Sequence, residues 1–291
     1  TSAGRCDAGL STMTGDAMGT TVGVIGTGNM GGALVRGWLR CADSPLTFLV
    51  YDVITERVEA LAEDARVTVA GSVDEVAAAD VILLVVKPKD VGSVLAGLRP
   101  RLGEDKMVVS SAAGVALETV RAAAGPAPAV FRIMPNLGVE VGEGVVAVAA
   151  EPGAAPETVA AVCALLDPLG LVQVVGEDLF DAVTAASGSS IAFLALMLEA
   201  MEDGAVRAGL PRPTARAFIR QTALAGALLL RQHEGSAADI KDQVSSPAGT
   251  TIAGLAALED AGVRGALMRA VEQAAERGRA LRDAARPRVL E

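Results

Sequence analysis

Thr21-Val-Gly-Val-Ile-Gly-Thr-Gly-Asn-Met-Gly31 is the stretch that decides the fold of this 291-residue chain. Its first five residues are mostly β-branched and predict a strand, and apolar residues at helical spacing follow over residues 33–39. The glycines between them form the pattern G-x-G-x-x-G, which in a strand–turn–helix context indicates a dinucleotide-binding turn. Gly26 permits the tight turn, Gly28 lets the backbone approach a pyrophosphate, and Gly31 lets the helix pack close to the strand.

Further apolar runs follow the glycine turn and predict alternating strands and helices. The run Val81–Val86 has no polar interruption, which is typical of a strand buried on both faces of a parallel sheet. We therefore expect an α/β fold with a Rossmann-like, doubly wound and mostly parallel sheet. The other strands predicted after the first are Leu46–Tyr51, Val67–Val69, Met107–Val109, Val130–Ile133, Val145–Ala149 and Leu171–Val175.

Polar or small residues follow several of these strands, where open α/β sheets bind ligands. Asp52 ends the second strand and is placed to bind both ribose hydroxyls of NAD and to repel the 2′-phosphate of NADP. Arg57 softens any rejection of NADP, so the pattern favours NADH without excluding NADPH. Asp52 also fits a helix cap or a solvated loop. Ser72 and Glu75 have the spacing of a capping box.

From Asp178 onward the sequence changes to a long helical pattern that is rich in Ala and Leu. Gly209 with its neighbouring prolines, and then Gly235, break this pattern. We predict a flexible tail over residues 1–20, a dinucleotide-binding domain over 21–177 and an all-helical domain over 178–291. Because so many apolar side chains would be exposed if the helices stood alone, we expect this second domain to bury them against a second copy of the chain.

Residues 241–252, Lys-Asp-Gln-Val-Ser-Ser-Pro-Ala-Gly-Thr-Thr-Ile, carry the second distinctive pattern of the chain. Ser246 before Pro247 predicts a helix N-cap, because proline suits the first helical position. Free backbone N–H groups and the hydroxyls of Thr250 and Thr251 would then form a seat for a carboxylate. An ordinary helix start is the alternative.

The pattern Lys-Asp-x-Val-x-Ser-Pro-x-Gly-x-Thr-Ile resembles the signature of the pyrroline-5-carboxylate reductase family. The resemblance implies reduction of the C=N bond of L-1-pyrroline-5-carboxylate to L-proline by NADH or NADPH, the last step of proline biosynthesis. It also implies a homodimer formed through the helical domain, or a ring of such dimers. The cofactor-binding residues that it implies, together with those indicated above, are Gly26, Gly28, Asn29, Met30, Gly31, Asp52, Ser72, Val86, Lys87, Pro88, Ala112, Ala113 and Asn136.

The same resemblance implies a seat for a cyclic imine carboxylate. Thr251 matches the family threonine near the ring nitrogen and is the predicted catalytic residue. Glu234 matches a position near the imine, although a solvated helix-end glutamate is an equal alternative, and Val244 would supply backbone beside the ring. The substrate-binding residues predicted in this way are Glu234, Val244, Ser246, Gly249, Thr250 and Thr251.

One segment departs from the family pattern and keeps other functions open. The family usually reads Ser-Gly-Ser-Gly-Pro-Ala-Tyr where this chain has Ser187-Gly-Ser-Ser-Ile-Ala-Phe193. A straighter helix and a less polar pocket wall would follow, so the substrate ring size stays open. The alternatives are a broader cyclic-imine reductase and a catalytically silent nucleotide-binding protein. A β-hydroxyacid dehydrogenase, which shares this two-part architecture, would need a lysine on the first long helix of the second half. Residues 178–209 contain no lysine, so this class of enzyme is disfavoured.

Composition excludes further classes. The net charge of −10 leaves no basic face for nucleic acid. The most apolar stretches, near 179–201 and 221–230, are interrupted or too short, so we predict no transmembrane helix and a cytoplasmic protein. Cys6, Cys41 and Cys163 lack metal-ligand spacing, so we expect free thiols and no bound metal. The single histidine, His233, is expected at the surface without a catalytic role.

Overall fold

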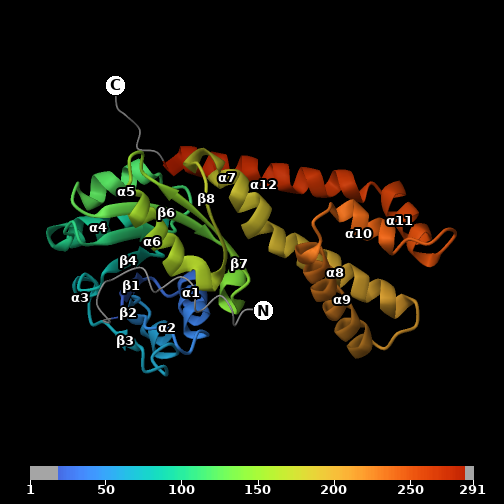
Figure 1. Cartoon of the computed structure of the whole chain (residues 1–291), viewed down its shortest axis with the longest axis horizontal. Coiled ribbons are helices and arrows are strands. Elements are labelled where there is room, and N and C mark those ends of the chain that lie inside the picture. Colours follow the sequence, from blue (N-terminus) through green and yellow to red (C-terminus); the bar gives the residue numbers. More distant parts are fainter. Residues whose placement is uncertain (1–18, 286–291) are drawn as a thin grey trace. The chain divides into compact units, whose positions relative to one another are not determined.

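The computed structural model describes residues 19–285, which fall into two compact units (Figure 1). The first contains the chain up to Gly188 and, in addition, the stretch from Ala275 onward. The second is Ser189–Ala274. The first unit is therefore built from two separate pieces of sequence. The predicted tail, residues 1–20, lies almost entirely outside the described residues.

The first unit contains one eight-stranded sheet of order β3-β2-β1-β4-β5-β6-β7-β8. Neighbouring strands are parallel except for the antiparallel pair β6 and β7. The predicted mostly parallel, Rossmann-like sheet is confirmed. The strands are β1 (Thr21–Ile25), β2 (Thr47–Tyr51), β3 (Val67–Val69), β4 (Val81–Leu84), β5 (Met107–Ser110), β6 (Ala129–Pro135), β7 (Gly144–Ala150) and β8 (Gly170–Val174).

Helices cover both faces of this sheet with two separate apolar cores. One core joins α1 and α6 to the strands, and the indole N–H of Trp38 donates to the Leu165 carbonyl at 2.7 Å. The other core joins α3, α4 and α5 to the opposite strand face. Because β4 contributes Leu83 to one core and Leu84 to the other, its uninterrupted apolar run is explained. The helices are α1 (Asn29–Leu39), α2 (Thr55–Glu59), α3 (Val73–Val76), α4 (Val91–Leu98), α5 (Leu117–Ala124), α6 (Pro156–Leu166) and α7 (Phe180–Val183).

A π-helical turn, Thr184–Ser189, follows α7 and leads into the long helices. The second unit contains helices alone among its described elements, as predicted for the second half. Buried residues are scarce in this unit: over Ser189–Ala274 they are Glu202 and Ala215. The helices are α8 (Ser190–Arg207), α9 (Arg212–Gln232), α10 (Ala237–Gln243), α11 (Thr250–Asp260) and α12 (Val263–Ala285).

Apolar side chains on these helices are exposed in the single chain. Leu196 is 66% exposed, Phe218 60% and Met268 60%. The continuous helical stretch Glu177–Arg207 is long and apolar enough, by length and composition, to cross a membrane. A core helix passes the same test, so the predicted absence of a membrane span stays a prediction. The domain boundary predicted near residue 177 also stays a prediction.

Candidate active site

The glycine turn between β1 and α1 is held in a geometry that only glycine permits at two positions. Gly26 has φ +94°, and its N–H donates to the Tyr51 carbonyl at 2.8 Å. A Cβ on Gly31 would lie 1.9 Å from the Gly26 carbonyl oxygen. Gly28 is the N-cap of α1 and offers no side-chain cap, so backbone N–H groups at Asn29 and Met30 remain available to an anion. These residues fit the diphosphate of a dinucleotide.

Asp52 lies beside this turn, but its carboxylate is already occupied. One oxygen accepts from the Thr27 N–H at 2.7 Å, and the other from the Ile54 N–H at 2.9 Å. Arg57 pairs with it at 3.4 Å, and the Asp52 side chain is 5% exposed. The Arg57 guanidinium also lies 3.8 Å from the point that a Cβ on Gly28 would occupy. The site therefore has a cation beside the turn and a carboxylate whose two oxygens already accept backbone hydrogen bonds.

Ser72 caps α3, as its spacing predicts. The Glu75 N–H donates to the Ser72 hydroxyl at 3.4 Å, and the Glu75 carboxylate accepts from the Gly71 N–H at 2.8 Å. Helix capping accounts for this serine, and its predicted role in cofactor binding stays a prediction.

The segments after β4 and β5 lie at the same edge of the sheet as the glycine turn, because β1, β4 and β5 are parallel neighbours. Val86, Lys87 and Pro88 follow β4, and Lys87 is exposed. Ala112 and Ala113 follow β5; the Ala112 methyl is buried in the core, so its backbone is what it offers a ligand.

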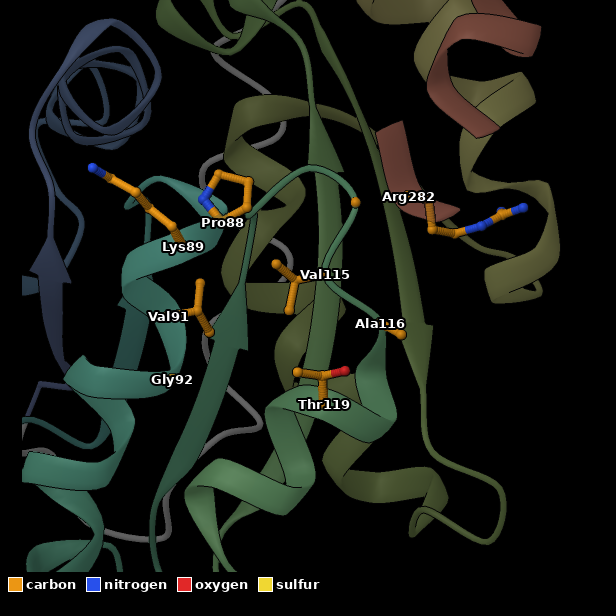
Figure 2. Close-up of a pocket in the computed structure, with 9 residues that line it drawn as sticks. Pro88, Lys89, Val91, Gly92, Val115, Ala116, Thr119 and Arg282 are labelled. Carbon is orange, nitrogen blue, oxygen red and sulfur yellow. The ribbon is translucent and has the colours of Figure 1, made fainter. Parts of the chain in front are cut away.

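A cavity of about 340 Å³ adjoins these segments (Figure 2). Figure 2 shows that Lys89 points away from the Thr119 hydroxyl and that Arg282 extends to the opposite side. The Arg282 guanidinium pairs instead with Asp181. The cavity is lined by Pro88, Lys89, Val91, Gly92, Gly114, Val115, Ala116, Thr119 and Arg282.

Asn136 directly follows β6 and is buried, at 7% exposed. Its amide oxygen accepts from the N–H groups of Gly138 and Val145, each at 3.1 Å. Its amide nitrogen donates to the Ser187 carbonyl at 3.2 Å, within the π-helical turn. Asn136 thus fixes the chain after β6 and leaves one N–H for a ligand. Its predicted role in cofactor binding remains a prediction.

The carboxylate seat differs from its prediction in one respect. Ser246 is not a helix N-cap: the Gly249 N–H donates to the Ser246 carbonyl at 3.1 Å, which closes a β-turn. Proline favours the second position of such turns as well as the first position of helices, so Pro247 fits both. Gly249 is the N-cap of α11 and makes no side-chain cap, while Ala248 takes φ +57°.

The structure brings four of the six predicted substrate residues into this one turn and helix start. Thr250 and Thr251 are the first two residues of α11, where the backbone N–H groups are free of helical partners. Val244 follows α10 as its C-cap and is 59% exposed. Glu234 is exposed in the segment between α9 and α10. The cofactor candidates lie in the first unit, and these substrate candidates lie in the second.

The segment before this turn is fixed by a capping box. Ser236 caps α10, and its N–H and hydroxyl both donate to the Asp239 carboxylate, at 2.6 and 3.1 Å. These bonds, the backbone one above all, hold the pKa of Asp239 below its ordinary value. His233 is half-buried, with its Nε2 3.7 Å from the same carboxylate. The predicted surface position of His233 stays a prediction: its side chain is 30% exposed and lies beside Asp239, which is 53% exposed.

One ion pair in the first unit, between a buried arginine and a glutamate that is 32% exposed, was not predicted from the sequence. The Arg132 side chain is 2% exposed and donates to the Glu177 carboxylate at 2.8 Å. The signal that was available is an arginine inside the apolar strand run Val130–Ile133, where a charge requires a partner.

Cysteine chemistry differs in part from its prediction. Cys41 is disulfide-bonded, so the expected free thiol is wrong there, and Cys6 lies outside the described residues. Cys163 is free, and burial raises the pKa of its thiol. Over residues 19–285, no cluster of three or more His, Cys, Asp or Glu side chains is arranged to hold a metal ion.

Two family models match parts of this chain. One, described as pyrroline-5-carboxylate reductase dimerisation, matches residues 177–281. The other, described as NADP oxidoreductase coenzyme F420-dependent, matches residues 21–114. The first match covers all of the predicted substrate residues, and the second covers the glycine turn and Asp52.

Relatives of known name match nearly the whole chain. The pyrroline-5-carboxylate reductase of Methanosarcina acetivorans is 38% identical over 264 residues, with 89% of this chain and 97% of the relative covered. That of Synechocystis is 40% identical, with 91% and 99% covered. The solved structure of a pyrroline-5-carboxylate reductase from Coxiella burnetii is 28% identical with a TM-score of 0.82, covering 90% of this chain and 98% of that one. A Plasmodium falciparum pyrroline carboxylate reductase with NADP bound is 26% identical with a TM-score of 0.78, covering 91% and 98%.

Proposed function

The chain belongs to the pyrroline-5-carboxylate reductase family, and from this premise we infer that it reduces L-1-pyrroline-5-carboxylate to L-proline with NADH or NADPH. The observation that carries this conclusion is the pair of anion seats, a glycine turn for a diphosphate and an uncapped helix start for a carboxylate, in a chain that matches such reductases along its length. The reaction adds a hydride to the imine carbon and a proton to the imine nitrogen.

The reduced dinucleotide supplies the hydride when it is bound. The protein contributes binding and orientation, because a protonated C=N carbon is already electrophilic and needs little acid–base assistance. The Gly26–Gly31 turn fits the diphosphate, since Gly28 is the N-cap of α1 without a side-chain cap and leaves the first backbone N–H groups of the helix to an anion. The strand ends at Val86–Pro88, Ala112–Ala113 and Asn136 would hold the nicotinamide half.

We place the substrate carboxylate at the start of α11. Thr250 and Thr251 offer backbone N–H groups, whereas the Gly249 N–H is held by the Ser246 carbonyl and Gly249 contributes by letting the chain turn there. The positive end of the helix dipole favours an anion at this position. Ser246, Thr250 and Thr251 add hydroxyls. Thr251 assists at the ring nitrogen, Glu234 favours the protonated imine, and the Val244 backbone lies beside the ring.

Replacement of Thr251 tests this placement. Thr251→Ala removes a hydroxyl and should lower turnover at least tenfold, which is about 1.4 kcal/mol of barrier. Thr251→Ser keeps the hydroxyl and should retain most activity. Steady-state kinetics of both variants decide the matter, and unchanged turnover in Thr251→Ala would remove this residue from the mechanism.

We propose that the cofactor site accepts both dinucleotides with a preference for NADH. Asp52 supports the preference, because an acidic residue at the end of the second strand binds the ribose hydroxyls of NAD in this fold. Its oxygens also accept from the N–H groups of Thr27 and Ile54, so a ribose would share them. Arg57 supports acceptance of NADPH, because it pairs with Asp52 at 3.4 Å and is 46% exposed beside the glycine turn. The ratio of kcat/KM for the two cofactors measures this preference directly.

The matched dimerisation model implies a homo-oligomer. We propose that the unit is a homodimer, or a ring of dimers, built through residues 189–274, where apolar side chains such as Leu196 and Phe218 are more than half exposed. Light scattering that gave a stable monomer at micromolar concentration would contradict this proposal.

A substrate panel tests the function itself. Oxidation of NADH or NADPH should be fastest with pyrroline-5-carboxylate, slower with piperideine carboxylate and slowest with cyclic imines that lack a carboxylate. Similar rates with imines that lack the carboxylate would favour a broader imine reductase. Cofactor binding without turnover on any imine would favour a silent nucleotide-binding protein.

A further inference from the structure

Arg132 is a fully buried charge on an otherwise apolar strand. Its side chain is 2% exposed, and it lies on β6 between Phe131 and Ile133, which are both 0% exposed. The cross-strand partner of Arg132 on β7 is Ala149, whose small side chain leaves room for the guanidinium. A charge in this position requires paired contacts, because burial removes its hydration.

Two directional contacts fix the guanidinium. One nitrogen donates to a Glu177 carboxylate oxygen at 2.8 Å, and the guanidinium carbon lies 4.6 Å from the centroid of the Phe180 ring. The same Glu177 oxygen accepts from the Leu117 N–H at 2.7 Å. Leu117 is the first residue of α5, so the carboxylate also lies at a helix N-terminus, where a negative charge is favoured.

The segment that holds Arg132 is itself anchored. Asp181, four residues after Glu177, is 8% exposed and pairs with Arg282 of α12. Phe180 between them is 1% exposed. The helical turn from Glu177 to Asp181 therefore connects β6, α5 and the last turns of α12, which is a rigid base for the guanidinium.

Arg132 is connected through this base to the strand end that forms the candidate cofactor site. Met134, two residues on and therefore on the same strand face, packs with Phe180 in one buried cluster. Asn136 follows and donates to the Ser187 carbonyl in the π-helical turn. Residues 132–136 are thus held from both ends, by the ion pair at one and the amide at the other.

Stability alone does not explain an arginine here. An apolar side chain of similar volume would avoid the desolvation cost, and replacing buried ion pairs in that way is often neutral or stabilising. What the pair supplies is direction, because a planar guanidinium that stacks on a ring and donates to a fixed carboxylate sets both angle and depth.

We propose that Arg132 is a positioning residue for hydride transfer: through Glu177 and Phe180 it fixes the Met134–Asn136 segment against the nicotinamide end of the cofactor. The inference rests on the proposed function, which places Asn136 at that end. Arg132 touches neither substrate nor cofactor in this role; it sets the geometry of the residues that do.

The experiment compares Arg132→Met with wild type in the full-length protein. We expect kcat to fall at least tenfold, with the KM values for dinucleotide and imine carboxylate changed less than threefold. The primary deuterium isotope effect with C4-deuterated NADH should rise, because hydride transfer becomes the slower step. Arg132→Lys keeps the charge without the planar fork and should recover part of kcat.

Arg121→Met is the matched control at the other end of the same strand. Arg121 pairs with Glu151 and donates to the Pro128 carbonyl at 2.8 Å, just before β6 begins. This variant should lower the unfolding temperature and leave both kcat and the isotope effect unchanged. An equal loss of kcat in both variants would overturn the inference, since it would then reflect general destabilisation.

Glu177→Gln keeps the experiment decisive if Arg132→Met does not fold. The amide oxygen still accepts from Leu117, so the expected result is a smaller fall in kcat and a raised isotope effect. Wild-type kcat in a folded Arg132→Met or Glu177→Gln variant refutes the positioning role alone. A wild-type protein that does not reduce pyrroline-5-carboxylate refutes the proposed function instead.

Discussion

The glycine turn at residues 26–31 and the signature turn at residues 246–251 are both helix starts with free N–H groups, but they are built in different ways. The glycine turn is enclosed: a Cβ on Gly26 would lie 2.5 Å from the Val85 carbonyl oxygen, and one on Gly31 would lie 1.9 Å from another carbonyl. The signature turn is open. A Cβ on Gly249 would lie 2.3 Å from the Ser246 hydroxyl oxygen, and its nearest neighbours all belong to that serine.

This difference separates two kinds of binding site. The glycine turn takes its shape from β1, β2 and β4, so its geometry is complete within one chain. The signature turn takes its shape from its own residues, and the apolar side chains around it, Val244 at 59% and Ile252 at 45%, are exposed. We expect the first site to tolerate no added atom at Gly26 or Gly31, and the second site to be sensitive to what a second subunit places beside it.

Alanine at one glycine of each turn gives the largest expected contrast. Gly31→Ala places a methyl group against backbone that cannot move, so we expect loss of dinucleotide binding or of folding. Gly249→Ala at φ −79° is allowed, and a change of Ser246 rotamer relieves its contact. Thermal unfolding and dinucleotide titration of both variants test the contrast, which fails if Gly31→Ala binds as wild type does.

Arg57→Ala tests how the site at the glycine turn discriminates between NADH and NADPH. Loss of this cation should lower kcat/KM for NADPH about tenfold, or about 1.4 kcal/mol, and leave kcat/KM for NADH within about twofold. The variant Arg36→Ala, which breaks an exposed pair with Glu140, serves as a control of equal charge change. Equal losses with both cofactors would show that Arg57 binds the shared diphosphate.

Ala248→Gly tests whether the signature turn stores strain. Ala248 has φ +57°, a conformation that costs an L-residue roughly 1 kcal/mol. Glycine removes this cost from the folded state, and part of the gain in stability is offset because glycine makes the unfolded chain more flexible. We expect the unfolding temperature to rise by about 2 °C. Ala253→Gly, in the interior of α11, should lower it by a similar amount. If the unfolding temperature falls in both variants, the backbone of Ala248 is not strained in the wild-type protein.

Asp239→Asn should have the smallest effect, at the helix that leads into the signature turn. Its folded pKa lies below 3.8, so its contribution to stability is present above that value and is lost as the pH falls through the folded pKa. The difference in unfolding free energy from wild type should therefore be constant near neutral pH and disappear under acid. Urea unfolding at several pH values measures it, and a difference that does not shrink as the pH falls would contradict this role of the carboxylate.

Local chemistry made the sheet and the glycine turn predictable from sequence. Each strand has its own apolar run, and the requirement for Gly26 and Gly31 follows from a turn of a few residues. The signature turn was predictable in content but not in form. Proline at residue 247 satisfies a helix start and a β-turn equally, and the positive φ of Ala248 leaves no mark in the sequence.

Contacts between distant residues set the limit of that prediction. Asp52 is occupied by Thr27, 25 residues earlier, and Arg132 is paired with Glu177, 45 residues later. No periodicity encodes such partners, because they depend on which strand ends the fold brings together. The same limit applies to the neighbourhood of His233, whose Nε2 lies 3.7 Å from the Asp239 carboxylate.

The end of α12, from Ala275 onward, belongs to the same unit as the sheet, and this determines where the chain can be divided. A truncated chain that stops at residue 188 would leave Asp181 without Arg282 and uncover Gly114, since a Cβ there would lie 3.5 Å from the Arg282 backbone. Transplanting the helices between homologues therefore needs two splice points, near residues 188 and 275, rather than a single junction. A protease that nicks the chain within residues 189–274 would leave both ends fastened to the same body.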